Sequence, residues 1–214
     1  IALLFFFFLY GWYYGRKIKN RYISFTPIDN YIEEFKALKA DDSIPFLSSN
    51  LVYITKADYP EDIETKIIYS IFQKQPKRAN TYFLIHVDND ESPKTFEYKV
   101  QQIIPGTLIK IDFKLGFKIE RRINLYFRQA IEDMVNAGEF SLESHYKSLQ
   151  KFNIKTNFLF VNLERILTVD YKLPNYEAFT MNLHNFLRHI SNNDIKALGL
   201  DTSSVFEEKI PIII

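Results

Sequence analysis

Cysteine is absent from the 214 residues, and this removes several kinds of chemistry together. Without a thiolate the chain cannot form a disulfide, a cysteine nucleophile, a thiolate zinc site or an iron–sulfur cluster. Glycine is also scarce, at 6 residues, and no glycines have the spacing of a dinucleotide-binding turn, a P-loop or a Gly-x-Ser-x-Gly nucleophile elbow. Nucleotide binding through those motifs, and hydrolysis of that type, are excluded.

A dominant charge is lacking too. Lys and Arg number 27 against 26 Asp and Glu, so the formal net charge is only +1. We therefore expect no nucleic-acid partner, because nothing creates a field over the whole molecule. An apolar content of 47% with 25% charged residues excludes disorder as the main state, and 16% aromatic residues favour strands or a heavy core.

The chain does contain a long apolar run at its start. Residues 1–14 carry no charge and include four consecutive phenylalanines. A helix needs about 20 residues to cross a membrane, so this run would make roughly two-thirds of a span. The basic residues follow the run, whereas in a signal peptide they precede it. A signal peptide is therefore excluded, and a buried strand or core helix remains the alternative to a membrane segment.

Aromatic and basic residues then follow in the order typical of a membrane exit. Aromatic side chains favour the headgroup level, and Lys and Arg favour the cytoplasmic flank. We interpret residues 1–22 as the end of the last transmembrane helix with its basic flank, 23–45 as a connector and 46–214 as a cytosolic domain. The predicted membrane-interface residues are Trp12, Tyr13, Tyr14, Arg16, Lys17, Lys19 and Arg21.

Patterning over the rest of the chain predicts alternating strands and helices. A strand at 51–54, a helix from Pro60 to Gln75 and a strand at 81–87 have the order of a parallel crossover unit. Residues 96–104 and 107–113 predict a hairpin around Pro105-Gly106, in which Lys110 and Asp112 point outward. Further strands are expected at 158–167 and from 205 to Pro211, the latter at a sheet edge because proline lacks an N–H.

Three helices carry apolar stripes at helical spacing, including two at 123–135 and 174–190, and a shorter helix is expected in the connector. The predicted fold is α/β, with a mixed central sheet and flanking helices, preceded by the end of a transmembrane helix. The three stripes are Ile63, Ile67, Ile68, Ile71 and Phe72; Ile123, Phe127, Ala130, Ile131 and Met134; and Phe179, Leu183, Phe186, Leu187 and Ile190.

Candidate chemistry is sparse. His86 precedes Asp88, Asp90 and Glu91, and carboxylates after a strand could hold Mg²⁺ or act as acid and base, although Asp and Asn also crowd ordinary turns. His184 and His189 are five residues apart, which places them off a shared helical face and argues against a metal pair. We assign no catalytic, metal or cofactor residue, and we expect a protein that is not an enzyme.

Basic residues offer a second hypothesis. Paired or clustered cations can bind phosphates, so an adenine-nucleotide-sensing module is the alternative function. The candidate residues are Lys74, Lys77, Arg78, Arg121 and Arg122.

Several segments resemble the cytosolic C-terminal region of the KUP/HAK/KT potassium-uptake transporters, in particular the bacterial Kup branch. Leu51-Val52-Tyr53-Ile54-Thr55-Lys56 is similar to the family's first cytosolic strand and Asp62 to Gln75 to its following helix. Leu115-Gly116-Phe117-Lys118 resembles its aromatic-Gly-Phe element, and Ser191 to Glu207 resembles its terminal helix and last strand.

The resemblance implies a proton-coupled K⁺ transporter of the cell inner membrane, with this region mostly cytoplasmic and the ion path in upstream helices. It also implies a homodimer and a regulatory role. The expected partners are the transmembrane part of the same transporter and the membrane, and some relatives respond to the adenine second messenger cyclic di-AMP. None of the family's ion-binding residues can be assigned here.

Overall fold

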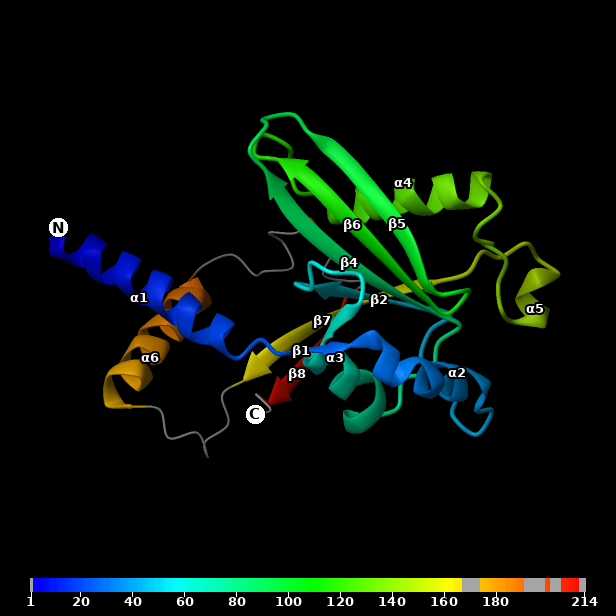
Figure 1. Cartoon of the computed structure of the whole chain (residues 1–214), viewed down its shortest axis with the longest axis horizontal. Helices are drawn as coiled ribbons and strands as arrows, with labels where there is room; N and C mark the ends of the chain where they lie inside the picture. The colour runs from blue at the N-terminus through cyan, green and yellow to red at the C-terminus, as the bar shows by residue number, and fades with distance from the viewer. Residues whose placement is uncertain (1, 167–173, 191–198, 201–204, 212–214) are drawn as a thin grey trace.

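A six-stranded mixed sheet forms the centre of the molecule, with helices on both of its faces (Figure 1). The computed structural model describes residues 2–166, 174–190, 199–200 and 205–211. The predicted α/β class with a mixed central sheet is confirmed. The strands of the sheet are β2 (Asn50–Thr55), β4 (Thr81–Asp90), β5 (Phe96–Ile104), β6 (Leu108–Gly116), β7 (Phe158–Ile166) and β8 (Val205–Pro211).

The strand order is β5-β6-β4-β2-β7-β8, so β2 and β4 lie in the middle. Neighbouring strands are parallel except for the β5–β6 hairpin, as predicted from its Pro-Gly turn. Gly106 has a φ of +63°, which glycine adopts without steric cost. β8 lies at an edge of the sheet. Its terminal Pro211, which has no N–H, therefore interrupts no hydrogen bonds between central strands.

Two apolar cores separate the sheet from its helices. One lies under α2 (Ile32–Ala40), α3 (Thr65–Ile68) and the π-helix η2 (Tyr69–Lys74). The other lies under α4 (Ile123–Asn136), which covers the opposite face. Burial on both faces explains why the central strands are continuously apolar rather than alternating.

The α4 prediction is confirmed in detail. All five residues of its predicted stripe are buried, and the helix has the strong one-sided pattern of a core-facing helix. Gly138 follows its end with a φ of +74°, and its N–H donates to the carbonyl of Val135. This left-handed residue stops the helix without strain.

The expected helix from Pro60 to Gln75 is wrong in its first part. Residues Asp62–Glu64 form β3 instead, paired antiparallel with β1 (Phe25–Pro27), and helix begins only at Thr65. Ile63 is buried in this strand, so the apolar spacing that suggested one long helix spans a strand and two short helical segments. The connector contains the expected short helix α2, preceded by the 3-10 turn η1 (Ile28–Tyr31).

The long N-terminal helix α1 (Ala2–Arg21) lies to one side of the sheet and packs against α6 (Asn175–Ile190), as Figure 1 shows. The short α5 (Lys147–Gln150) lies at the far side of the molecule. Among the residues that the structure describes, none of the helices combines the length and the apolar character needed to cross a membrane. The interpretation of residues 1–22 as the end of such a helix stays a prediction.

Candidate functional site

The predicted membrane-interface residues all lie in the second half of α1. Trp12, Tyr13 and Tyr14 expose large parts of their side chains, and the Tyr14 ring lies 4.6 Å from that of Tyr10, one turn earlier, at a tilt of 36°. Arg16, Lys17 and Arg21 are exposed in the next turns, while Lys19 is partly buried. The helix therefore presents aromatic and then basic side chains to the surroundings, in the predicted order.

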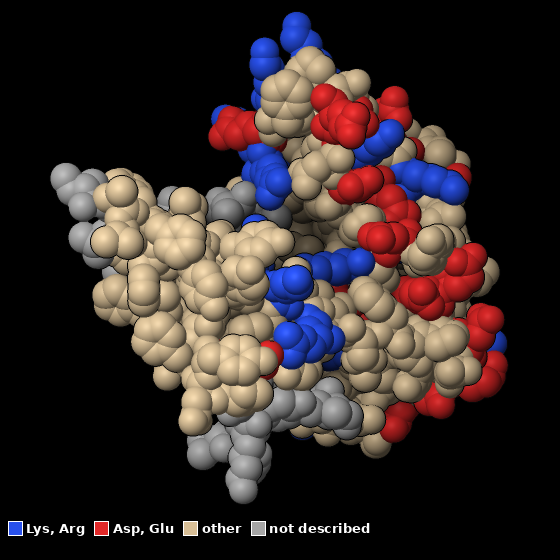
Figure 2. Space-filling view, turned by 60° about the vertical axis from the view of Figure 1, so that its left-hand side comes forward, with Lys and Arg blue, Asp and Glu red and all other residues tan. Residues whose placement is uncertain are grey.

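The phenylalanines before them are not part of the globular core. Phe5, Phe6, Phe7 and Phe8 keep 41% to 66% of their surface exposed. Figure 2 shows the resulting broad area without charged residues on one side of the molecule, bordered by Lys and Arg and well separated from most of the Asp and Glu. An exposed apolar area of this kind marks an interaction surface.

Two glycines allow α1 and α6 to approach closely. A Cβ at Gly11 would lie 2.5 Å from Leu183 Cδ2, and one at Gly15 would lie 2.4 Å from His184 Cβ. Neither glycine could carry a side chain without moving α6. The spacing Gly11-x-x-x-Gly15 is the small-residue pattern that brings membrane helices together, and it was the sequence signal for this contact that our sequence analysis missed.

The basic end of α1 is tied to the domain by polar contacts. Arg21 Nη1 lies 3.0 Å from Glu177 Oε1 at the start of α6, and this glutamate is 6% exposed. Lys56 Nζ, after β2, donates to Asn20 Oδ1 at 3.0 Å. Ile18 is buried between these contacts. The last turn of α1 is thus held by α6 and by the carboxyl end of the central strand.

Among the described residues, the apolar stripe predicted for residues 174–190 does not lie in either core. Phe179 and Phe186 are more than half exposed, whereas Glu177, Thr180, Met181 and His184 are buried. The buried side of α6 contacts α1 through the Glu177–Arg21 ion pair and through the His184 ring beside Trp12. The side chain of Ile190, and that of His189, lie outside those described.

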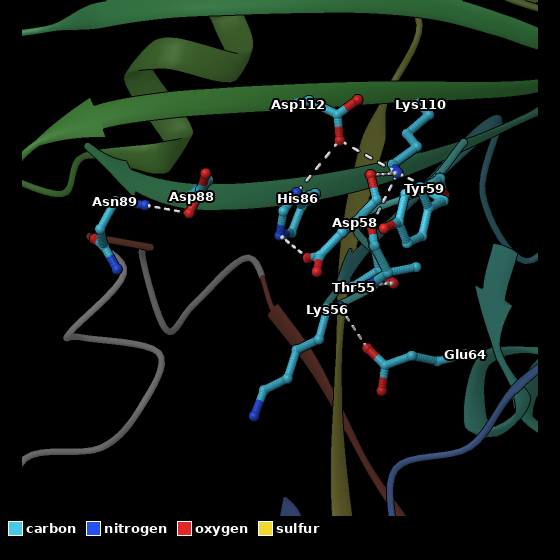
Figure 3. Close-up of polar contacts among 11 residues, drawn as sticks. Thr55, Lys56, Asp58, Tyr59, Glu64, His86, Asp88, Asn89, Lys110 and Asp112 are labelled. Atoms are coloured by element: carbon cyan, nitrogen blue, oxygen red, sulfur yellow. Dashed lines mark hydrogen bonds and ion pairs between the residues drawn. The ribbon is translucent and has the colours of Figure 1, made fainter. Parts of the chain in front are cut away.

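A polar cluster occupies the carboxyl end of β2 and β4, on the sheet face that α3 covers (Figure 3). Lys110 on β6 is completely buried, contrary to its predicted outward direction. Its ammonium donates to the carbonyls of Ala57, Asp58 and Tyr59 at 2.8, 3.1 and 2.9 Å. One buried cation thereby fixes the loop after β2, which has no regular structure of its own to satisfy these carbonyls.

His86 lies between two carboxylates in the same cluster. Its Nε2 is 3.1 Å from Asp58 Oδ1, and its Nδ1 is 3.4 Å from Asp112 Oδ1, as Figure 3 shows. A neutral imidazole has one N–H, so it could donate to only one of these anions. Asp112 Oδ1 also lies 3.3 Å from Lys110 Nζ. Through these contacts, strand β6, strand β4 and the loop after β2 share one polar cluster.

A groove of about 550 Å³ opens beside this cluster. Apart from Asp58, its polar residues come from three adjacent strands in register, where Asp112 pairs with both Lys99 and His86, and Lys114 with both Glu97 and Asp88. Lys99 and Lys114 therefore each lie opposite a carboxylate on a neighbouring strand, an arrangement that stabilises a sheet surface. The groove is lined by Asp58, His86, Asp88, Glu97, Tyr98, Lys99, Asp112, Phe113 and Lys114.

The acidic residues singled out after His86 have local partners. β4 continues through Asp90, so Asp88 and Asp90 lie in a strand and not in the expected loop. Asp88 accepts from the N–H of Asn89, and Asp90 accepts from the Thr95 hydroxyl and lies 3.4 Å from Lys114 Nζ. Thr95 and the Lys114 contact hold the pKa of Asp90 below its usual value. Glu91 follows the strand and is exposed.

Lys77 and Glu208 form a second buried ionic pair. The Lys77 ammonium donates to Glu208 Oε1 at 3.0 Å and to the Ser70 carbonyl at 2.6 Å, while Ser70 Oγ donates to Glu208 Oε2. Burial lowers the pKa of Lys77, and Glu208 only partly offsets this. Burial alone would raise the pKa of Glu208, but the hydrogen bonds from Ser70 and Lys77 outweigh it and keep that pKa low.

The other basic candidates for phosphate binding also have protein partners. Arg78 donates to the carbonyls of Lys39 and Ile44, pairs with Asp42, and lies over the Phe46 ring at 4.2 Å. Lys74 Nζ donates to the Lys209 carbonyl and lies near Glu208.

Arg121 donates to Asn89 Oδ1, and Arg122 pairs with Glu120. Arg78 precedes β4, whereas these two arginines follow the carboxyl end of its parallel neighbour β6. The structure does not bring the five residues together.

Comparison with known proteins gives a consistent result. Residues 48–214 match the family model described as the K⁺ potassium transporter C-terminal domain. The chain is 48% identical over 203 residues, 95% of its length, to a probable potassium transport system protein Kup of Cytophaga hutchinsonii. It is also 41% and 31% identical over its whole length to proteins of the same name from Flavobacterium johnsoniae and Clostridium perfringens.

The chain covers 31% to 33% of the length of these relatives. No solved structure matches it. The matched segment includes the whole six-stranded sheet with both polar clusters. The chain therefore belongs to the potassium transporter family of Kup proteins, as its C-terminal domain.

Proposed function

We propose that this chain is the cytosolic regulatory domain of a K⁺ uptake transporter, joined to the membrane by α1. The transport path lies in membrane segments outside the chain, which covers a third of its relatives. The domain itself is not an enzyme; it acts by contacting the membrane part differently in different transport states.

One observation carries this proposal. A helix with exposed phenylalanines, then aromatic and then basic residues leads through residues 22–47 into a domain of the K⁺ transporter family. Membrane–cytosol junctions have this order of residue types. The Arg21–Glu177 and Lys56–Asn20 contacts give the junction a physical link to α6 and to the central strand β2.

Such a link can transmit movement only if the two transport states differ in these contacts. A shift of the basic turn of α1 would separate Arg21 from Glu177, which is buried and would lose its partner. The state that keeps the ion pair is then favoured. In this way a domain without a transport path of its own biases the transporter.

K⁺ uptake by the full-length transporter tests the regulatory role. In a host without its own K⁺ systems, we compare the intact protein, a protein cut after the position of Arg21, and the Glu177→Gln variant, each at matched membrane levels. We expect altered uptake kinetics in both variants. Unchanged uptake with unchanged expression in both would refute regulation, and Glu33→Gln, which removes an exposed pair within α2, is the control.

We further propose proton coupling and a homodimer. Uptake that acidifies the cell interior in step with K⁺ entry, and that stops with a protonophore, supports coupling. Cross-linking of full-length protein in native membranes tests the dimer, and a purely monomeric pattern at matched expression would contradict it.

Adenine-nucleotide sensing remains the alternative function, with less support from the geometry. Of its five proposed residues, Lys77 and Arg78 are buried in internal contacts and the other three have partners of their own. The groove beside His86 is lined by four carboxylates and two lysines, which does not favour an anion. Calorimetry with cyclic di-AMP and AMP decides the matter, since the absence of heat at millimolar ligand removes this alternative.

A further inference from the structure

We propose that α6 is a second lipid-contacting helix, which lies beside α1 with its aromatic side among the headgroups and upper acyl chains of the bilayer. This inference rests on the proposed attachment of α1 to the membrane and extends it to a helix more than 150 residues later in the chain. It assigns a role to the apolar stripe that is absent from the core.

Three sides of α6 differ in character. The buried side carries Glu177, Thr180, Met181 and His184. A polar exposed side carries Asn182 and Asn185. The third side is apolar and consists of Tyr176, Phe179, Leu183, Phe186 and Leu187, of which Tyr176, Phe179 and Phe186 are each 55% to 67% exposed.

An amphipathic surface helix normally turns its apolar side toward the protein. In α6 the aromatic residues of the apolar side are exposed, while Leu183 and Leu187 are partly buried. A separate polar side, which already suits water, lies next to them. A helix with this division, and with aromatic residues on the apolar side, is typical of one that lies in a membrane interface.

The apolar side of α6 is continuous with that of α1. Phe7 of α1 meets Phe179 edge-on at 6.1 Å, and Trp12 lies 5.4 Å from His184. Gly11 and Gly15 bring the helix axes close enough for these contacts. Whatever environment accommodates the exposed phenylalanines of α1 therefore also reaches Phe179.

The charges of the two helices favour lipid over a polar partner. Of the 26 acidic residues in the chain, α1 and α6 contain only Glu177, which is buried against Arg21. Among the side chains of the two helices that the structure describes, the exposed charged ones, Arg16, Lys17 and Arg21, are all basic. Basic side chains beside an apolar surface complement anionic headgroups, each contributing attraction near the membrane surface.

Single-cysteine probes test this placement directly, because the natural chain has no cysteine. The whole chain is reconstituted into vesicles of phosphatidylcholine and phosphatidylglycerol, with an environment-sensitive fluorophore on Phe179→Cys or Phe186→Cys. The matched controls are Asn182→Cys and Asn185→Cys on the polar side of the same helix. We expect nitroxide lipids to quench the probes at 179 and 186 several-fold more strongly than those at 182 and 185.

A Phe6→Cys probe on α1 separates the two proposals. Quenching at position 6 with equal, weak quenching at all four α6 positions would overturn the role of α6 and leave the attachment of α1 intact. No quenching at any position, including 6, would overturn both. If the unlabelled cysteines at 179 and 186 form disulfides between two copies, and the labelled ones are shielded from lipid, a second chain covers this side, which also overturns the proposal.

Discussion

Single buried charges hold this fold together at two places. Lys110 donates hydrogen bonds to three carbonyls of the loop after β2, and Glu208 pairs with Lys77, which follows η2. Leaving a buried polar group without its partner costs far more than the pair contributes on balance. Replacing one partner should therefore lower the free energy of unfolding strongly, whereas replacing both partners together should lower it only slightly.

Lys110→Met should destabilise the domain by about 3 kcal/mol, because three carbonyls lose their donor. Chemical unfolding of the whole chain in mild detergent measures this. Lys114→Met is the matched control: it lies on the same strand and face, but it is 51% exposed and its ammonium lies 3.4 Å from Asp90 at the surface. We expect the control to cost less than about 1 kcal/mol. Equal losses for the two variants would contradict the role given to Lys110.

Glu208→Gln should destabilise the chain at neutral pH by about 3–5 kcal/mol, since it leaves Lys77 buried without a counter-charge. The double variant Glu208→Gln with Lys77→Met should recover most of that loss. Unfolding free energies of Glu208→Gln, Lys77→Met and the double variant, measured in one buffer, provide the check. If the loss in the double variant equals the sum of the two single losses, the pair does not interact.

The same glutamate should give the fold part of its acid sensitivity. Its pKa in the folded chain lies below the 4.5 of a free glutamate, so its contribution is complete above that value and is lost as the pH falls through the folded pKa. The unfolding free energy of the natural chain should therefore decrease with acidification below about pH 4.5. The slope should be shallower in Glu208→Gln, and identical slopes would refute this assignment.

Residue-level contacts were the part that the sequence did not predict. Alternation along β6 placed Lys110 outward, because a period of two cannot tell a solvated face from one covered by a second layer. The seven residues predicted at the membrane interface all lie on α1, and their contact with lipid stays a prediction. The partners of Lys77 and Arg78 come from distant parts of the chain, which spacing does not reveal.

At the scale of elements, the pairing of α1 with α6 depends on backbone proximity rather than on apolar side chains. Alanine is usually favoured over glycine within a helix by about 1 kcal/mol. Here the opposite should hold at Gly15, where a Cβ would overlap His184.

Gly15→Ala should accordingly loosen α6 and raise the rate of hydrogen exchange along it, with little change in β4. Tyr13→Ala, on an exposed position of the same helix, should leave that exchange unchanged. Faster exchange throughout the sheet, rather than in α6, would argue against a local contact.

Helices and strands with one regular spacing of apolar residues were predicted well. The segment from Pro60 to Gln75, which combines a strand with two helical segments, was not. α4 keeps its whole stripe in the core, and the parallel order of β2 and β4 follows from the strand–helix–strand pattern. The segment around Ile63 failed because β1 recruits it as a strand partner, a tertiary effect that outweighs local spacing. Residues 191–198 and 201–204, which belong to the segment predicted as the terminal helix and the start of the last strand, lie outside the described residues.

At the scale of the whole molecule, charge is unevenly distributed. The α1–α6 side displays apolar and basic residues, while most acidic residues lie elsewhere (Figure 2). With a net charge of +1, this separation gives an orientation preference near an anionic membrane without a strong overall attraction.

Replacing Arg16 and Lys17 together by Gln should weaken partition into phosphatidylglycerol vesicles by roughly 30-fold, from about 1 kcal/mol per charge. Replacing Lys147 and Lys151 by Gln, near α5 at the far side of the molecule, removes the same charge and should have little effect. Vesicle co-sedimentation at low salt measures both. Equal weakening would mean that net charge, not the end of α1, determines binding.

The position of β8 has a consequence for biosynthesis. Glu208 belongs to this last strand of the sheet, yet it completes a pair with Lys77, from more than a hundred residues earlier. A nascent chain that has not yet released this strand from the ribosome holds an ammonium group without its anion. Premature termination before Val205 would leave that defect permanently and mark the product for degradation.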